Sequence, residues 1–256
     1  MRFFIFICSL LACSGGQVFA KRAMNFELRA DYVSKYIWRG QNVDDDPVFQ
    51  QSINLNWEDF TAAIWGNLEL TNINDKRGNF SEIDYYLDYS SDLLGSKGIG
   101  YSVGFIYYDF PGATADGTRT PDTSEIFGGL NFYLPLNPSV TVYYDLDEVE
   151  GSYASLSFEH NIEKITQITP NVPVGLDISA SLGYGSGSYN KYYWGTDQSK
   201  LNDLMFSVSF HIEIGGCTLV PSLNYVTLVS DDIRDSNAYG TDSDFFVAGI
   251  SLVKIF

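Results

Sequence analysis

The feature that most constrains this chain is an alternation of apolar and polar residues with a period of two, which predicts β-strands whose two faces meet different surroundings. The predicted strands are longer than the ~5–6 residues usual in soluble proteins and match the ~9–11 tilted residues that cross a bilayer. Twelve segments show the pattern: 26–38, 48–57, 60–70, 82–90, 99–110, 124–134, 139–148, 152–162, 174–185, 201–214, 218–229 and 244–256.

The connections between these segments alternate in length. Short ones follow the even-numbered segments, at 58–59, 135–138 and 215–217. Longer polar ones follow the odd-numbered segments, at 39–47, 71–81, 111–123, 186–200 and 230–243. Short turns at one end and long loops at the other are typical of outer-membrane barrels. Two connections break the rule, because 149–151 is short and 163–173 is long.

The two faces of the predicted strands differ sharply. One face is apolar and aromatic, with Phe26, Tyr85 and Phe206 among its residues. The other face is polar, and it carries the candidates for lining the lumen and setting its ion selectivity: Glu27, Arg29, Asp31, Glu69, Glu82, Asp84, Asp88, Asp145, Asp147, Asp177, Asp203 and Glu213. A soluble sandwich would show the same alternation with its apolar face inward, so the alternation alone does not separate the two folds.

Acidic residues dominate the polar face. With Glu125 and Glu159 included, thirteen carboxylates face three cations: Arg29, Lys35 and Arg39. We expect Arg29 to lie between Glu27 and Asp31. Since three cations cannot neutralise thirteen anions, the lumen should attract cations and repel anions. The net charge of the whole chain, −17, also argues against a nucleic-acid partner.

The first twenty residues, "MRFFIFICSLLACSGGQVFA", have the order of a secretory signal: a cation, an apolar core and a small-residue cleavage site. We therefore expect residues 1–20 to be a signal peptide and 21–256 the barrel domain. A lipoprotein signal with Cys13 acylated is the alternative. Removal of residues 1–20 leaves Cys217 as the one cysteine, so no disulfide can form within the chain.

The chain closes on "FVAGISLVKIF", an alternating stretch that ends at Phe256. It resembles the C-terminal strand that the assembly machinery of outer-membrane barrels reads. A second stretch, 31–90, resembles the opening of the TorF-type putative porins, through Tyr32, Trp38, Arg39, Gly40, Pro47, Gln50, Trp65, Glu82, Ile83 and Asp84. These resemblances imply a Gram-negative outer-membrane barrel that meets lipid, lipopolysaccharide and the barrel assembly machinery.

The sequence gives little support for an enzymatic or a metal-binding site. His160 and His211, the two histidines, fall on different segments and opposite faces, which disfavours a catalytic triad or a shared metal. The acidic stretches 44–46 and 231–244 lack a regular calcium-loop spacing, although calcium binding there stays open. The aromatic stretch 186–195 fits the rim of a membrane barrel better than a carbohydrate platform. We expect no enzyme and no cofactor.

The sequence thus predicts an all-β fold, a single closed antiparallel transmembrane β-barrel of about 12 strands. The predicted function is a porin-like channel for passive diffusion of small solutes that prefers cations. One alternative is a barrel plugged by side chains, with a structural or binding role, because twelve strands lie between side-chain-filled and water-filled barrels. A secreted β-sandwich binding module is a weaker alternative.

Overall fold

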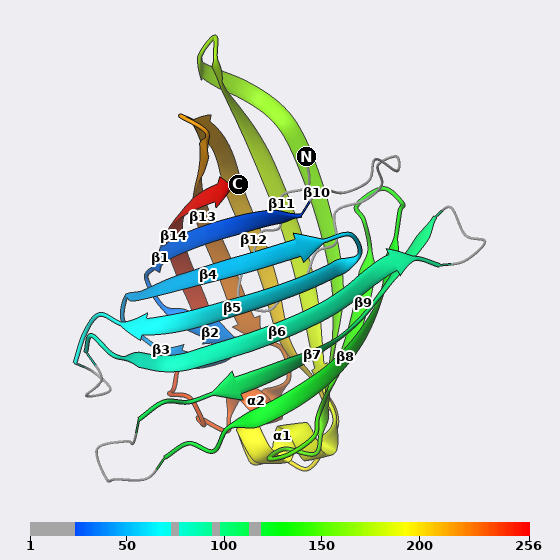
Figure 1. Cartoon of the computed structure of the whole chain (residues 1–256). Coiled ribbons are helices and arrows are strands. Elements are labelled where there is room, and N and C mark those ends of the chain that lie inside the picture. Colours follow the sequence, from blue (N-terminus) through cyan, green and yellow to red (C-terminus); the bar gives the residue numbers. More distant parts are fainter. Residues whose placement is uncertain (1–23, 73–76, 94–97, 113–118) are drawn as a thin grey trace.

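A closed antiparallel sheet makes up most of the chain (Figure 1). The computed structural model describes residues 24–72, 77–93, 98–112 and 119–256. The predicted signal peptide, 1–20, therefore lies outside the described residues. The strands of the barrel are β1 (Asn25–Val33), β4 (Val48–Trp57), β5 (Phe60–Glu69), β6 (Phe80–Asp92), β7 (Ile99–Asp109), β8 (Thr123–Phe132), β9 (Ser139–Asp145), β10 (Ser152–Thr169), β11 (Val172–Gly185), β12 (Lys200–Ile214), β13 (Cys217–Leu228) and β14 (Asp244–Ile255).

The first and last strands close the barrel. β1 and β14 pair antiparallel, with Tyr32 opposite Ile250. Phe26 and Phe256 complete the ladder, because the Phe256 N–H donates to the Phe26 carbonyl at 2.8 Å and the Phe26 N–H donates back at 3.3 Å. Closure removes the two free edges that an open sheet would expose. The predicted twelve-stranded barrel is therefore confirmed.

Side chains alternate between an apolar outer face and a polar inner face. On β12, for example, Phe206 is 48% exposed and Ser207 is 4% exposed. The same contrast runs around the barrel, with exposed Leu28, Tyr85 and Val142 on its outside. A soluble sandwich would bury these apolar side chains, whereas a transmembrane barrel presents them to lipid. The structure thus excludes the sandwich alternative.

The first predicted strand, 26–38, is too long. β1 ends at Val33, where the Ser34 N–H donates to the Ala248 carbonyl at 2.9 Å. The chain then forms a separate two-stranded sheet, β2 (Tyr36–Trp38) and β3 (Gln41–Asp44), before it returns to the wall as β4. The predicted polar loop 39–47 is thus mostly the second half of a hairpin. We call β2–β3, residues 36–44, the mouth hairpin.

The predicted long connection at 163–173 is also wrong. β10 continues to Thr169 and β11 begins at Val172, so the connection is a tight turn at 170–171. In Figure 1 this β10–β11 hairpin rises beyond its neighbours. Residues 161–171 of this hairpin are exposed on both faces, and Ile162, Ile165 and Ile168 recur every third residue. No period of two remains there, because both faces meet the same surroundings.

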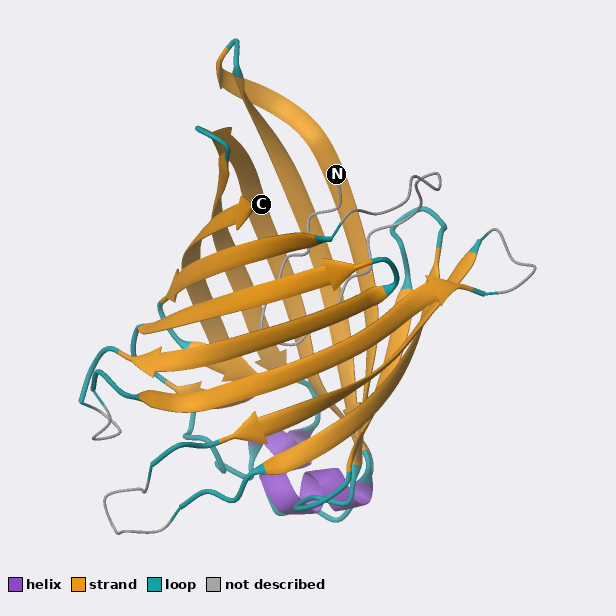
Figure 2. Cartoon of the chain, in the orientation of Figure 1, coloured by secondary structure: helices purple, strands orange, loops and turns teal. Residues whose placement is uncertain are grey.

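Two short helices lie at the end of the barrel that carries the long connections (Figure 2). α1 (Gly187–Trp194) begins after Ser186, whose hydroxyl accepts the Tyr189 N–H at 3.3 Å, and it ends at Gly195 with a φ of 73°. α2 (Asp231–Arg234) is a single turn. Over the described ranges, neither these helices nor any other is long and apolar enough to cross a membrane. We call this end of the barrel the loop end and the opposite end the turn end.

Candidate functional site

The inner face of the barrel holds most of the residues predicted to line the lumen. Asp84, on β6, is half-buried. Asp147 lies beyond the end of β9 and Glu213 near the end of β12, and both are exposed. The remaining candidates are buried on the polar face of their strands: Glu27, Arg29, Asp31, Glu69, Glu82, Asp88, Asp145, Asp177 and Asp203. Twelve strands therefore enclose a strongly acidic interior.

The mouth hairpin folds because its turn suits two residues in the left-handed region. Arg39 has a φ of 49° and Gly40 a φ of 81°, which is the pattern of the tight turns that join antiparallel strands. A side chain at Gly40 would also clash, since its Cβ would lie 2.8 Å from atoms of Asp203 and Leu228. The glycine thus allows the tip of the hairpin to approach β12 and β13 closely.

Arg39 extends from this tip into a cage of side chains on the barrel wall. Its Nη1 and Nη2 donate to the two carboxylate oxygens of Glu125 at 2.7 and 2.8 Å. Its guanidinium carbon lies 4.3 Å from the ring centre of Tyr143, 4.5 Å from that of Tyr153 and 4.5 Å from that of Trp38. Arg39 is 3% exposed. The guanidinium is therefore held by a bidentate ion pair and by aromatic rings.

Burial and charge act in opposite directions on Arg39. Burial is the largest single influence and lowers the pKa of the guanidinium, but the Glu125 carboxylate and the hydroxyls of Tyr108 and Tyr189 together outweigh it, so the net shift is upward. Arginine keeps its charge in any case at physiological pH. The tip of the mouth hairpin thus places one permanent positive charge among the carboxylates of the interior.

Other residues of the mouth hairpin reach different parts of the wall. The Tyr36 hydroxyl donates to Glu82 on β6 at 2.9 Å, and its ring lies 5.7 Å from that of Trp65 on β5. Gln41 donates to the Tyr189 hydroxyl of α1 at 3.1 Å. Arg39 contacts side chains of β8, β9 and β10, and Gly40 lies against β12 and β13. The hairpin therefore crosses the interior from one side to the other. It therefore narrows the loop end.

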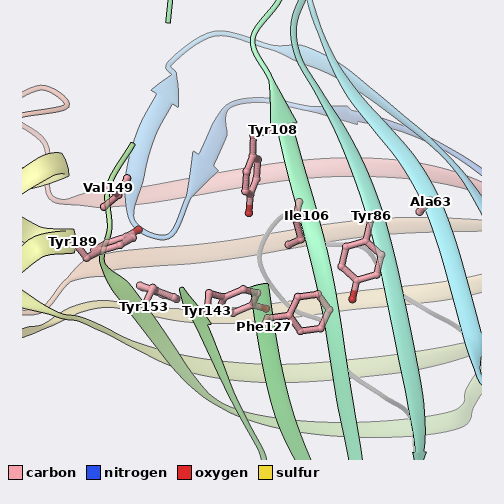
Figure 3. Packing of buried hydrophobic residues seen from close by; sticks show 9 residues of the cluster. All are labelled: Ala63, Tyr86, Ile106, Tyr108, Phe127, Tyr143, Val149, Tyr153 and Tyr189. Carbon is pink, nitrogen blue, oxygen red and sulfur yellow. The ribbon is translucent and has the colours of Figure 1, made fainter. Parts of the chain in front are cut away.

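Aromatic residues on the inner face continue the cage. Figure 3 shows Tyr86, Phe127 and Tyr143 on separate strands, with their rings in a row. The ring centres of Tyr86 and Phe127 are 5.4 Å apart, and those of Phe127 and Tyr143 are 5.6 Å apart. Tyr153 follows, and its hydroxyl donates to Asp203 on β12 at 2.9 Å. This cluster was not predicted from the sequence, although aromatic residues on the otherwise polar face are a signal for it.

The aromatic stretch 186–195 is not a membrane rim. Tyr189 is 1% exposed and Trp194 is 3% exposed, and both belong to clusters of buried side chains at the loop end. Of the four aromatic residues in the stretch, Tyr192 alone is exposed. The stretch forms α1, which packs over the mouth hairpin through the Gln41–Tyr189 hydrogen bond. Its buried aromatic residues therefore pack at the loop end, where Tyr189 binds the mouth hairpin, instead of facing lipid.

Asp145 has a structural task. Its Oδ1 accepts the N–H groups of Asp147 at 3.0 Å and Val149 at 2.9 Å, and its Oδ2 accepts the Thr123 hydroxyl at 2.6 Å. These bonds turn the chain directly after β9, so that the predicted strand 139–148 ends at Asp145. Side chains of Asp that bind nearby backbone N–H groups are common at such turns.

The predicted positions of the other basic side chains are partly wrong. Lys35 lies between β1 and β2 and pairs with Asp45, instead of lining the lumen from a strand. This contact lowers the pKa of Asp45. Arg29 pairs with Asp31 on its own strand, with Nε–Oδ1 at 2.8 Å. His211 Nδ1 lies 3.0 Å from Asp177, and no group of three or more metal-ligating side chains gathers within the described residues.

Comparisons with known proteins address the fold. No protein-family model matches the chain, and no curated protein matches it. The structure is similar to that of the NanC porin, with a TM-score of 0.51 and 11% sequence identity over 89% of this chain and 98% of that chain. It is also similar to an outer membrane channel from Pseudomonas putida F1, with a TM-score of 0.51 and 8% identity over 93% of this chain and 97% of that chain.

At such identities the likeness concerns the fold alone, and the resemblance of residues 31–90 to TorF-type porins stays a prediction. The chain has the fold of outer-membrane β-barrel proteins, with an acidic interior and a hairpin across its loop end.

Proposed function

We propose that the protein is a porin-like channel of a Gram-negative outer membrane, through which small solutes diffuse passively with a preference for cations. The observation that carries this proposal is the composition of the enclosed inner face. Two arginines are buried among the described residues, Arg29 and Arg39, against ten buried carboxylates: Glu27, Asp31, Asp44, Glu69, Glu82, Asp88, Glu125, Asp145, Asp177 and Asp203. A barrel with a purely structural role has no need of so many charges.

The cation preference follows from how these charges pair. Arg29 is bound to Asp31 and Arg39 to Glu125, so each arginine neutralises one carboxylate. The others keep a negative potential inside low-dielectric walls, which concentrates cations and repels anions. Rings of Asp and Glu act in this way in cation channels. The mouth hairpin then lies across the path at the loop end.

The proposed location rests on the outer face and on the last strand. Apolar side chains cover the outside of the barrel, and Phe256 ends the ladder that closes it. We expect the assembly machinery to read this strand, and lipid and lipopolysaccharide to surround the folded barrel. Fractionation should recover the protein in the outer membrane, and the unboiled protein should migrate differently from the boiled one on a denaturing gel. A soluble periplasmic protein without that difference would contradict the location.

A non-conducting barrel is the second candidate, and the mouth hairpin favours it. Contacts from residues 36–41 reach both sides of the interior, so a hairpin that never moves would leave the lumen closed. Such a barrel would serve as a structural or binding protein.

Single-channel recording of refolded protein in a planar bilayer separates the two candidates. We expect discrete conductance steps, and under a salt gradient a reversal potential of the sign for cations. The preference should weaken at high salt, because the screening length falls to ~3 Å at 1 M. An anion-selective reversal potential would contradict the cation preference. Absence of conductance in protein that shows the gel shift would favour the non-conducting barrel.

A further inference from the structure

The wall of the barrel binds the Arg39 side chain in the way that a protein binds a ligand, because Arg39 is not itself part of the wall. Arg39 comes from a hairpin whose strands pair with each other and form a sheet separate from the barrel. The groups that hold it come from three neighbouring strands of the wall: Glu125 on β8, Tyr143 on β9 and Tyr153 on β10. We call these three residues the guanidinium cage.

The cage has supports of its own that do not involve the hairpin. The Tyr108 hydroxyl donates to Glu125 Oε2 at 2.9 Å, and Tyr153 donates to Asp203 at 2.9 Å. The ring centres of Tyr143 and Tyr153 are 6.4 Å apart. These contacts join strands of the hydrogen-bonded wall, and Figure 3 shows Tyr108, Tyr143 and Tyr153 among its residues. The cage should therefore keep its shape when the hairpin leaves, and a preformed site is what a ligand needs.

The geometry of the cage matches a guanidinium group more closely than an ammonium group. Glu125 presents both oxygens to two nitrogens at 2.7 and 2.8 Å, which needs a planar fork of donors. Tyr143 and Tyr153 lie within stacking distance of the guanidinium carbon, and a flat cation uses both rings. An ammonium ion is a compact point charge that cannot form the fork.

We propose that the guanidinium cage is a binding site for solutes that carry a guanidinium group, and that Arg39 occupies it while the mouth is closed. A guanidinium solute competes with Arg39 for the cage and takes its place when the hairpin moves aside. Binding depends on the cage alone, whereas entry of the solute into the barrel rests on the proposed channel function.

Arg39→Ala tests the site, because it empties the cage and leaves Glu125 without its cation. Calorimetry of the refolded full chain in detergent would compare guanidinium chloride with ammonium chloride, at concentrations too low to denature. We expect guanidinium to bind Arg39→Ala tighter than ammonium, and tighter than it binds the native chain, by about tenfold or more. The double variant Arg39→Ala with Glu125→Gln is the matched control and should lose this binding.

Equal binding of the two cations would overturn the proposal, since it would reveal only an unpaired carboxylate. Absence of binding to folded Arg39→Ala would overturn it as well. If Arg39→Ala does not show the gel shift of a folded barrel, Arg39→Lys replaces it, because lysine keeps the charge without the fork. Guanidinium must then bind Arg39→Lys tighter than the native chain, or the proposal fails. Failure to conduct would contradict the channel and leave this binding test unaffected.

Discussion

Two buried arginines mark the difference between the wall of the barrel and its mouth. Arg29 lies on β1 and pairs with Asp31 on the same strand, and its Nη2 donates to Ser251 on the neighbouring β14 at 2.7 Å. Arg39 lies on a hairpin and pairs with Glu125, a residue 86 positions away on β8. The first pair joins residues that the sheet already holds together. The second pair fixes a segment that no ladder attaches to the wall.

The mouth, rather than the wall, is where the molecule can move. Every strand of the wall has two hydrogen-bonded neighbours, so opening one place would break a continuous ladder. Among the described strands, no ladder joins the mouth hairpin to the wall, and side-chain hydrogen bonds of Tyr36, Arg39 and Gln41 hold it across the interior. Movement at the loop end therefore needs only side-chain contacts to break, while the wall stays intact.

The largest effect should come from replacing each arginine by alanine. Arg39→Ala leaves the Glu125 carboxylate buried without its cation. Removing one partner of a buried ion pair destabilises the folded protein by about 3–5 kcal/mol. The hairpin can avoid this loss of stability by leaving the mouth, so we expect a higher single-channel conductance. Arg29→Ala should lower the free energy of unfolding of the barrel and leave the conductance near that of the native chain. Equal conductance changes in both variants would remove the distinction between wall and mouth.

The next effect concerns charge along the wall. Asp84→Asn, Asp88→Asn and Glu159→Gln together remove three carboxylates from the polar face of β6 and β10 and keep the size of each side chain. We expect a smaller cation-selective reversal potential and an unchanged gel shift. Asp145 is unsuitable for this purpose, because its carboxylate holds the turn after β9.

The control for that variant changes three exposed residues on the connections, as Glu150→Gln, Asp231→Asn and Asp235→Asn. It removes the same number of charges from outside the enclosed face, so selectivity should change less. An equal change in both triple variants would mean that the lumen-facing carboxylates do not set selectivity.

A smaller effect should follow pH at the mouth. Burial raises the pKa of Asp44 on the hairpin to about 7, and the nearby carboxyls of Glu69 and Asp46 contribute. In the undocked hairpin the pKa should be near its ordinary value of ~3.9. Protonation of Asp44 thus favours the docked hairpin. This stabilisation of the docked state is complete below pH ~4 and is lost as the pH rises through about 7.

We therefore expect conductance to increase between pH ~4 and ~7, and the increase to be reduced in Asp44→Asn, which stays neutral throughout. Conductance recorded across this range in both proteins checks the sign. A decrease with rising pH, or the same increase in Asp44→Asn, would show that Asp44 does not control the docking of the hairpin.

The wall could be predicted from the sequence because each strand separates lipid from a polar interior. β4 (Val48–Trp57) coincides with the predicted segment, and closure by the last strand followed from its alternation. The mouth could not be predicted in the same way. No alternation marks a hairpin that lies within the interior, and pairing of Arg39 with Glu125 depends on how the closed barrel brings β8 opposite the first loop. Aromatic residues on the polar face, Tyr143 and Tyr153 among them, are the signal in the sequence that could have indicated it.

Removal of the mouth hairpin tests most directly whether this hairpin restricts the lumen of the barrel. Val33 and Val48 are paired in the ladder, so a short glycine-serine linker can replace residues 36–44 without separating β1 from β4. Single-channel conductance of this variant would be compared with that of the native chain, with the gel shift as proof of folding. We expect a folded barrel that conducts several-fold more than the native chain. Equal conductance, or none in either protein, would contradict this expectation.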